Sequence, residues 1–329
     1  MMRSLGLGWL WAGMGCLLAS GLLAQDEAQS ISRGAQVDKT TPPTSITWEN
    51  ATQRSPWIFL GDSNTYAGGY VAQLEARLKV AAPQVQVLNL GVSSETASGL
   101  SEIDHPFKRP CVHERLDKVL RMTQPQLVFA CYGMNDGIYD PPNAERLEAY
   151  KSGMLRLSHK VREHGAQLIV LTPPIFEPEP VGAKGKFGPT KEGRYAYFAP
   201  YQRYDDVLEQ QAAWVLKNEL QAATVIDIRG PLQAFKRQRA VDEPTFAYSR
   251  DGVHFGEDAH ALIAQEILRA LHAPPEVREA PLTVEQLAAA TERTKLRRDA
   301  YLSATGKNRP GLPAGLPIWL ADQRANQIP

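Results

Sequence analysis

The sequence lacks an excess of charge of either sign: 36 Lys and Arg side chains balance 36 Asp and Glu side chains among 329 residues. It also lacks a long basic block, so the positive surface that nucleic-acid-binding domains use is missing. Hydrophobic residues make up 43% of the chain, which excludes a disordered or collagen-like protein. The composition therefore indicates a folded, neutral protein with no nucleic-acid partner.

Metal-binding motifs and cysteines are also scarce. The chain contains no His-Glu-x-x-His stretch and no Cys-x-x-Cys pair, so we expect neither a metal nor another cofactor. Of its three cysteines, Cys111 and Cys131 lie outside the amino-terminal segment. An oxidising compartment allows them to form one disulfide. Cys131 lies inside an apolar run, however, which favours a buried free thiol.

An uncharged run from Leu5 to Leu23 stands out at the amino terminus. Arg3 precedes it and Ala24 ends it, before a polar stretch. This order is typical of a secretory signal peptide cleaved near Ala24, so we expect a secreted or periplasmic protein with no stable membrane insertion. A lipoprotein signal at Cys16 or a membrane anchor is less favoured, because the run stays apolar beyond Cys16 and contains five glycines.

Five short, almost continuous apolar runs follow in the central part of the chain. They are Trp57 to Leu60, Val85 to Leu90, Leu127 to Cys131, Leu168 to Leu171 and Thr224 to Ile228. Such runs are typical of strands buried on both faces. Amphipathic segments alternate with them, which predicts a parallel sheet of about five strands between two layers of helices. The expected fold class is therefore a three-layer α/β/α fold.

In such a sheet the chemistry lies beyond the carboxyl ends of the strands. Ser63 follows the first apolar run, and His254 follows Asp251 by three residues before the last amphipathic segment of the sheet domain. Hydrolysis of an ester at neutral pH needs a nucleophile, a base and a group that orients the base. Ser63, His254 and Asp251 are the candidates for these roles, although serine also caps helices and aspartate also forms turns.

The reaction further needs hydrogen-bond donors for the oxyanion that develops on the ester carbonyl. The candidates are the backbone N–H groups of Ser63 and Gly91 and the side-chain amide of Asn135, each just after an apolar run. A simpler alternative is that Asn135 belongs to an ordinary turn and that Gly91 is required only for its backbone angles.

Four segments together resemble a known family. Gly61-Asp62-Ser63, Gly91, Gly133-Met134-Asn135-Asp136 and Asp251-x-x-His254 resemble, in chain order, the four sequence blocks of the SGNH, or GDSL, hydrolases. The resemblance covers about residues 55–272 and implies a flavodoxin-like fold with Ser63, Asp251 and His254 as the catalytic triad. It also implies Ser63, Gly91 and Asn135 as the oxyanion-hole donors. Asn64 departs from the pattern, because many members have Leu there.

The domain organisation follows from these assignments. We expect a signal peptide at 1–24, a polar linker at 25–53, the SGNH catalytic domain at 54–275, and a helical and Pro/Gly-rich extension at 276–329. The expected function is removal of short acyl groups, foremost acetyl, from a carbohydrate through an acyl-enzyme on Ser63. A lysophospholipase or broad acyl esterase is the alternative within enzymes, and a non-catalytic carbohydrate-binding protein with the same fold is the alternative outside them.

Substrate contacts are expected mainly in the aromatic loop at 173–200, because long loops over strand ends concentrate binding residues. The partner is then a small-molecule or polysaccharide ester. The alternative is that these aromatic side chains only pack the loop. The candidate contacts are Tyr132, Asp136, Phe176, Tyr195 and Tyr197.

Overall fold

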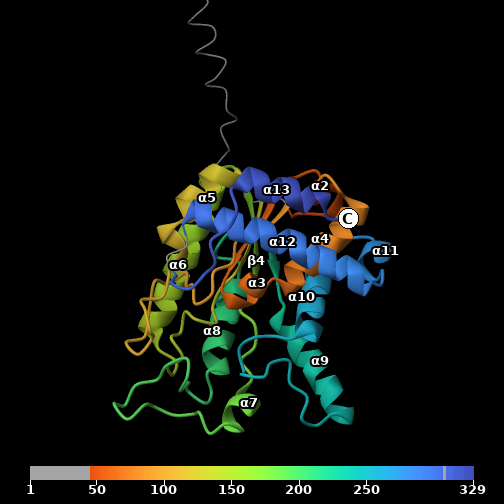
Figure 1. Cartoon of the computed structure of the whole chain (residues 1–329). Coiled ribbons are helices and arrows are strands. Elements are labelled where there is room, and N and C mark those ends of the chain that lie inside the picture. The colour runs from red at the N-terminus through yellow and green to blue at the C-terminus, as the bar shows by residue number, and fades with distance from the viewer. Residues whose placement is uncertain (1–44, 307–308) are drawn as a thin grey trace, which may run out of the picture. The chain divides into compact units, whose positions relative to one another are not determined.

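The structure is a computed structural model that describes residues 45–306 and 309–329 (Figure 1). The predicted signal peptide at 1–24 and most of the predicted linker, residues 25–44, lie outside this range. Every helix within the described range is too short or too polar to span a membrane.

The predicted apolar runs form one parallel sheet within the described residues. Its strands are β1 (Trp57–Gly61), β2 (Val87–Asn89), β3 (Leu127–Cys131), β4 (Gln167–Leu171) and β5 (Thr224–Ile226). They lie in the order β2-β1-β3-β4-β5, and every neighbouring pair is parallel. This is the flavodoxin-like order, in which β1 and β3 flank the switch point where ligands bind. The predicted α/β fold is confirmed.

Alternate side chains of each strand point to opposite faces of the sheet, as the strand period requires. Phe59 and Phe129 face one side and stack with ring centroids 4.5 Å apart. Ile58 and Val128 face the other side. Both faces are buried, which explains why the runs lack a polar alternation.

Helices cover both faces. The face of Phe59 is covered by α2 (Trp48–Thr52), α4 (Gly69–Ala81), α9 (Arg229–Asp242) and α10 (Glu257–Ala270). The face of Ile58 is covered by α5 (Leu116–Thr123), α6 (Ala144–Glu163) and α8 (Asp205–Leu216). Short elements, α3 (Ser63–Ala67), η1 (Val112–Glu114) and α7 (Pro178–Gly182), lie in the connections. Figure 1 shows α7 and α9 at the end of the sheet away from α2 and α13.

The predicted linker, residues 25–53, extends too far into the folded domain. Ile46, Trp48 and Ala51 are buried in the core, and the indole N–H of Trp57 donates to the carbonyl of Ala51 at 3.1 Å. Helix α2 is only five residues long. A helix this short shows no apolar periodicity, and because the residues before it are polar, the sequence gave no indication of it.

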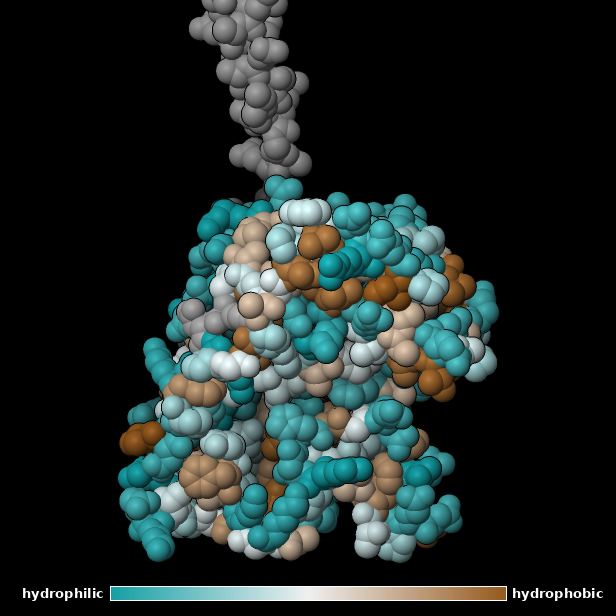
Figure 2. Space-filling model, viewed as in Figure 1, coloured by the Kyte–Doolittle hydropathy of each residue, from teal (hydrophilic) through white to brown (hydrophobic). Residues whose placement is uncertain are grey.

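The carboxyl-terminal extension consists of α11 (Pro275–Arg278), α12 (Val284–Thr305) and α13 (Ile318–Gln327). Helix α12 lies in the extension that was expected to be partly helical, whereas the Pro/Gly-rich composition gave no indication of α13. Helix α12 packs against α4 and β2, and α13 packs against α12. In the view of Figure 2, hydrophobic residues form separate patches on a largely hydrophilic surface, several of them at the end where α13 lies.

Candidate active site

Ser63 is the first residue of α3, directly after β1. Asp62 caps this helix, because its carboxylate accepts the N–H of Asn64 at 2.9 Å. Gly61 allows the turn to be tight, since a Cβ there would lie 2.2 Å from the hydroxyl oxygen of Thr65. These local features place the Ser63 hydroxyl at the carboxyl end of β1.

His254 and Asp251 lie on the connection before α10 and meet Ser63 in a continuous hydrogen-bonded chain. The Nε2 atom of His254 lies 2.9 Å from Ser63 Oγ, and its Nδ1 atom lies 2.7 Å from Asp251 Oδ2. A carboxylate accepts only, so Nδ1 carries the proton of the neutral ring. Nε2 is then free to accept the proton of Ser63.

The charged forms of Asp251 and His254 stabilise each other. The hydrogen bond to Asp251 raises the pKa of His254 above its ordinary value, while burial acts in the opposite direction. Burial would raise the pKa of Asp251, but the His254 ring and nearby backbone N–H groups lower it far below its usual range. Asp251 is therefore ionised, and it stabilises the imidazolium form of His254.

Buried Asp62, next to the nucleophile, behaves differently. Burial raises its pKa to about 6, although the hydrogen bond from Asn64 acts in the opposite direction. Its negative charge also favours the protonated form of His254.

Several contacts hold the loop of His254, and the sequence gave no sign of them. The hydroxyl of Ser249 donates to Asp251 Oδ1 at 2.8 Å, and the buried carboxylate of Glu177 accepts the Ser249 N–H at 2.8 Å. Gly252 has a φ of +86°, and a Cβ there would lie 2.5 Å from the carbonyl oxygen of Glu177. The loop therefore needs glycine between Asp251 and His254.

Asn64 is a further residue that sequence reasoning left without a role. Its side chain is buried and hydrogen-bonds to the backbone of Val253 and Phe255, on either side of His254. Asn64 directly follows Ser63, so its side chain connects the helix that carries the nucleophile to the loop that carries His254.

Among the predicted oxyanion donors, Asn135 is held in one orientation. Its Nδ2 donates to the carbonyl of Glu95 at 3.2 Å, and its Oδ1 accepts the hydroxyl of Tyr139 at 3.2 Å. These partners fix which end of the amide is the donor. The amide has two N–H bonds, so one remains for a ligand.

The structure does not support Gly91 as an oxyanion donor. Its N–H donates to Asn89 Oδ1 at 3.0 Å, and a Cβ there would lie 2.5 Å from the backbone nitrogen of Tyr66. Gly91 is thus required for close packing against α3. Nearby, Ser94 has a φ of +69°, and its N–H has no hydrogen-bond partner within the described residues. It directly precedes Glu95, whose carbonyl bonds to Asn135.

A cleft opens beside the Ser63–His254 contact, and two of the predicted substrate contacts, Phe176 and Tyr197, line it. The full lining comprises Tyr139, Phe176, Val181, Lys184, Lys186, Tyr197, Phe198, Pro200, Asp251, Val253 and His254. Tyr197 and Phe198 are 46% and 43% exposed, and their rings pack edge to face.

Tyr132, Asp136 and Tyr195 do not line the cleft, so their prediction as wall residues is corrected. Tyr132 is fully buried, and its hydroxyl donates to the carboxylate of Glu95 at 2.7 Å. Asp136 is buried and accepts the backbone N–H groups of residues 97 and 98. Tyr195 packs edge to face on Tyr201. All three support the loops instead of facing the cleft.

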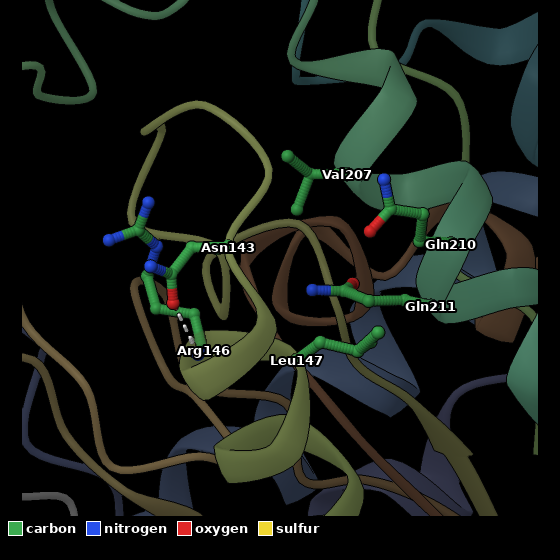
Figure 3. Close-up of a pocket in the computed structure, with 7 residues that line it drawn as sticks. Asn143, Arg146, Leu147, Val207, Gln210 and Gln211 are labelled. Carbon is green, nitrogen blue, oxygen red and sulfur yellow. Dashed lines mark hydrogen bonds between the residues drawn. The ribbon is translucent and has the colours of Figure 1, made fainter.

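A second hollow lies between the start of α6 and the start of α8 (Figure 3). Its lining is Gly137, Asn143, Arg146, Leu147, Val207, Gln210 and Gln211. None of these residues belongs to the Ser63–His254–Asp251 hydrogen-bonded series, and none is a serine, cysteine, histidine or carboxylate that could act as nucleophile or base. The cleft next to His254 is therefore the candidate substrate site.

Within residues 45–306 and 309–329, no group of His, Cys, Asp and Glu side chains is arranged to hold a metal ion. Cys111 and Cys131 are both buried free thiols.

The family profile described as GDSL-like Lipase/Acylhydrolase matches residues 59–262. No curated protein sequence gives a significant match. The solved structure of a gut microbial diltiazem-metabolizing enzyme is similar at 15% identity with a TM-score of 0.50, over 70% of this chain and 47% of that one. This chain thus spans about half the length of that enzyme.

Two solved acetyl esterases are also similar to this chain. A variant acetyl-xylooligosaccharide esterase from Geobacillus stearothermophilus is 17% identical with a TM-score of 0.47, covering 71% of this chain and 98% of that one. An acetyl xylan esterase is 16% identical with a TM-score of 0.46, covering 66% and 99%.

Proposed function

This chain belongs to the GDSL-like lipase/acylhydrolase family, and we propose that it is a carboxylic ester hydrolase with Ser63 as its nucleophile. The observation that carries the proposal is the 2.9 Å contact between Ser63 Oγ and His254 Nε2, continued to Asp251. His254 takes the proton of Ser63 as Oγ attacks the ester carbonyl, and Asp251 stabilises the imidazolium that forms.

The reaction then proceeds in two stages. In the first, the Oγ–carbonyl bond forms, the ester C–O bond breaks, and His254 gives its proton to the departing alcohol. In the second, water gives a proton to His254 and attacks the acyl carbon, and the Ser63–acyl bond breaks as His254 returns that proton to Ser63 Oγ. Asp251 holds the ring in the same orientation in both stages.

Three N–H groups are proposed to bind the oxyanion: those of Ser63, Ser94 and the Asn135 side chain. Ser63 begins α3, so its N–H needs no partner within the helix. Ser94 has an unbonded N–H adjacent to the residue that Asn135 contacts. Such fixed donors strengthen their hydrogen bonds as charge develops on the carbonyl oxygen.

The proposed substrate is a carbohydrate that carries a short acyl group, foremost acetyl. Support comes from the partly exposed rings of Tyr197 and Phe198 on the cleft, since exposed apolar side chains next to polar ones mark binding grooves. The location is part of the same proposal: residues 1–24 direct export and are removed. Mass spectrometry of the exported chain is expected to place its first residue near Gln25.

The decisive experiment compares wild type with Ser63→Ala on 4-nitrophenyl acetate. We expect the variant to lose at least about 10³-fold in kcat, because the nucleophile is absent. A fluorophosphonate is expected to label wild type and not the variant. Ser152→Ala, on an exposed position of α6, is the matched control and keeps full activity. Equal rates for wild type and Ser63→Ala contradict the mechanism.

The acyl length is tested separately with acetyl and octanoyl esters of the same alcohol. A preference for acetyl supports the carbohydrate proposal. A preference for octanoyl contradicts it and favours a lysophospholipase or broad acyl esterase.

A further inference from the structure

Two lysines line the same cleft as His254. Lys184 and Lys186 lie in the turn that follows α7. The turn is held by the backbone N–H groups of both residues, which donate to the carbonyl of Val181 at 3.1 and 3.3 Å. Two ammonium groups are thereby carried on a hydrogen-bonded turn beside the proposed base.

Neither lysine is neutralised by a carboxylate among the described residues. The Nζ of Lys184 donates to the backbone carbonyl of Arg250 at 2.5 Å, and the ammonium group of Lys186 has no partner in the described part of the chain. The acidic residues at the start of α7, Glu177 and Glu179, pair with Lys236 at 3.0 and 2.9 Å.

The charge balance of the cleft is consequently positive. Among its lining residues, Asp251 is the one carboxylate, and its charge is taken up by His254 and by backbone N–H groups. Exposed lysines on an open surface are ordinary and need no ligand. Lys184 and Lys186 differ because they share a concave site with aromatic rings and with the hydrogen-bonded Ser63–His254–Asp251 chain.

We infer that the cleft takes an anionic saccharide ester. This inference rests on the proposed function: the acyl carbon lies at Ser63, and a negatively charged group of the sugar chain lies at Lys184 and Lys186. The aromatic rings of Tyr197 and Phe198 contact the uncharged faces of the sugar. The shared chemistry is an anionic oxygen group, which a uronic acid supplies as carboxylate and a sulfated sugar as sulfate.

The first test measures kcat/KM on acetylated oligogalacturonate and on acetylated xylo-oligosaccharide, which is neutral. Wild type is expected to prefer the anionic substrate at low salt and to lose this preference as salt screens the charges. The double variant Lys184→Gln/Lys186→Gln is expected to lose about tenfold in kcat/KM on the anionic ester, through KM. The readout is the ratio of the two kcat/KM values, in which a general loss of activity cancels.

The matched control is Lys217→Gln/Lys295→Gln, which removes the same charge from exposed positions, one directly after α8 and one on α12. This control is expected to retain the anionic preference. If the cleft variant keeps the preference, or if wild type favours the neutral substrate at low salt, the inference is overturned.

A binding measurement separates this inference from the proposed function. Ser63→Ala is titrated with oligogalacturonate, with a sulfated galactan oligosaccharide and with neutral xylo-oligosaccharide. Tightest binding of oligogalacturonate assigns the anion as a carboxylate, and tightest binding of the sulfated oligosaccharide assigns it as a sulfate. Equal binding of all three overturns the inference. A failure of the proposed function itself is detected in a different experiment: Ser63→Ala then hydrolyses 4-nitrophenyl acetate as fast as wild type.

Discussion

The side chain of Asn64 brackets His254: its Nδ2 donates to the carbonyl of Val253 at 3.0 Å, and its Oδ1 accepts the N–H of Phe255 at 3.1 Å. Asn64 directly follows Ser63 on α3, so one buried amide joins the nucleophile helix to the loop of the base. Leucine at this position offers neither a donor nor an acceptor. The departure from the common signature therefore has a physical consequence in this chain.

Replacement of Asn64 by leucine is predicted to lower kcat by about 10- to 100-fold with little change in KM, because a displaced base slows proton transfer more than it weakens binding. The acidic limb of the pH profile is also expected to move to lower pH, since His254 is then held less firmly against Asp251. Steady-state kinetics on 4-nitrophenyl acetate between pH 5 and 9 measures both effects.

Asn218→Ala is the control for this variant. Asn218 makes the same pair of bonds, donating to the carbonyl of Ala222 at 3.0 Å and accepting its N–H at 2.9 Å, but after α8. We expect a loss of stability of about 1–3 kcal/mol and an unchanged pH profile. A pH profile of Asn64→Leu identical to that of wild type reduces Asn64 to a structural role.

The pH dependence of wild type follows from the raised pKa of His254. A general base acts only when neutral, so kcat/KM falls as the pH drops through this pKa, at a midpoint above the usual 6.5. Asp251→Asn removes the main cause of the shift, so its midpoint is predicted to move to lower pH. The same change lowers kcat by about 10³- to 10⁴-fold, because the amide no longer selects the productive tautomer.

The control for Asp251→Asn is Asp242→Asn, which changes an exposed carboxylate at the end of α9. Its pH profile is expected to match wild type. An Asp251→Asn profile with an unmoved midpoint means that another group governs the acidic limb.

Asn135→Asp tests the oxyanion donor with minimal change of shape. The variant keeps an oxygen for the hydroxyl of Tyr139 and loses the N–H that the developing oxyanion requires. We predict a loss of about 10²- to 10³-fold in kcat with a small change in KM. Asn143→Ala is the control, because Asn143 only caps α6. A kcat for Asn135→Asp within about threefold of wild type removes Asn135 from the oxyanion hole.

The carboxyl-terminal extension is predicted to be part of the stable domain. Arg293 on α12 forms a buried ion pair with Glu75 on α4, at 2.6 Å. Arg293→Met leaves Glu75 buried without a partner and is expected to cost about 3–5 kcal/mol of unfolding free energy. Adding Glu75→Leu to this variant is expected to recover most of the loss, because no buried charge then remains.

Urea denaturation measures these differences, with Arg239→Met as the control. Arg239 pairs with Glu243 on the surface, so its replacement changes stability by about 0–1 kcal/mol. An Arg293→Met variant as stable as this control contradicts an integral role for α12. A second contact links α12 to the site: Arg298 donates to the carbonyl of Tyr66 on α3 at 2.7 Å.

The strands were predictable because burial on both faces produces continuous apolar runs, and the edges of the predicted and observed strands differ by a few residues at most. The residues that follow strand ends were also predictable as a group, since parallel strands end at one edge of the sheet. The directions in which their side chains point were not predictable. Tyr132 directly follows β3, as a cleft residue would, yet its hydroxyl donates to the buried carboxylate of Glu95 in the connection after β2.

Ser63, Asp251 and His254 could be singled out from the sequence alone, because their chemistry is local and so is their place, Ser63 after an apolar run and the other two before an amphipathic segment. What the tertiary structure decided is which groups meet across long separations. The Asn64 side chain hydrogen-bonds to the loop of His254. The N–H of Gly91 donates to Asn89, whereas the N–H of Ser94 has no partner within the described residues. Hydrogen bonds depend on distance and direction in space, and chain order carries neither, so the bonds of Asn64 to the loop of His254, the unbonded N–H of Ser94 and the two lysines of the cleft became evident only from the folded structure.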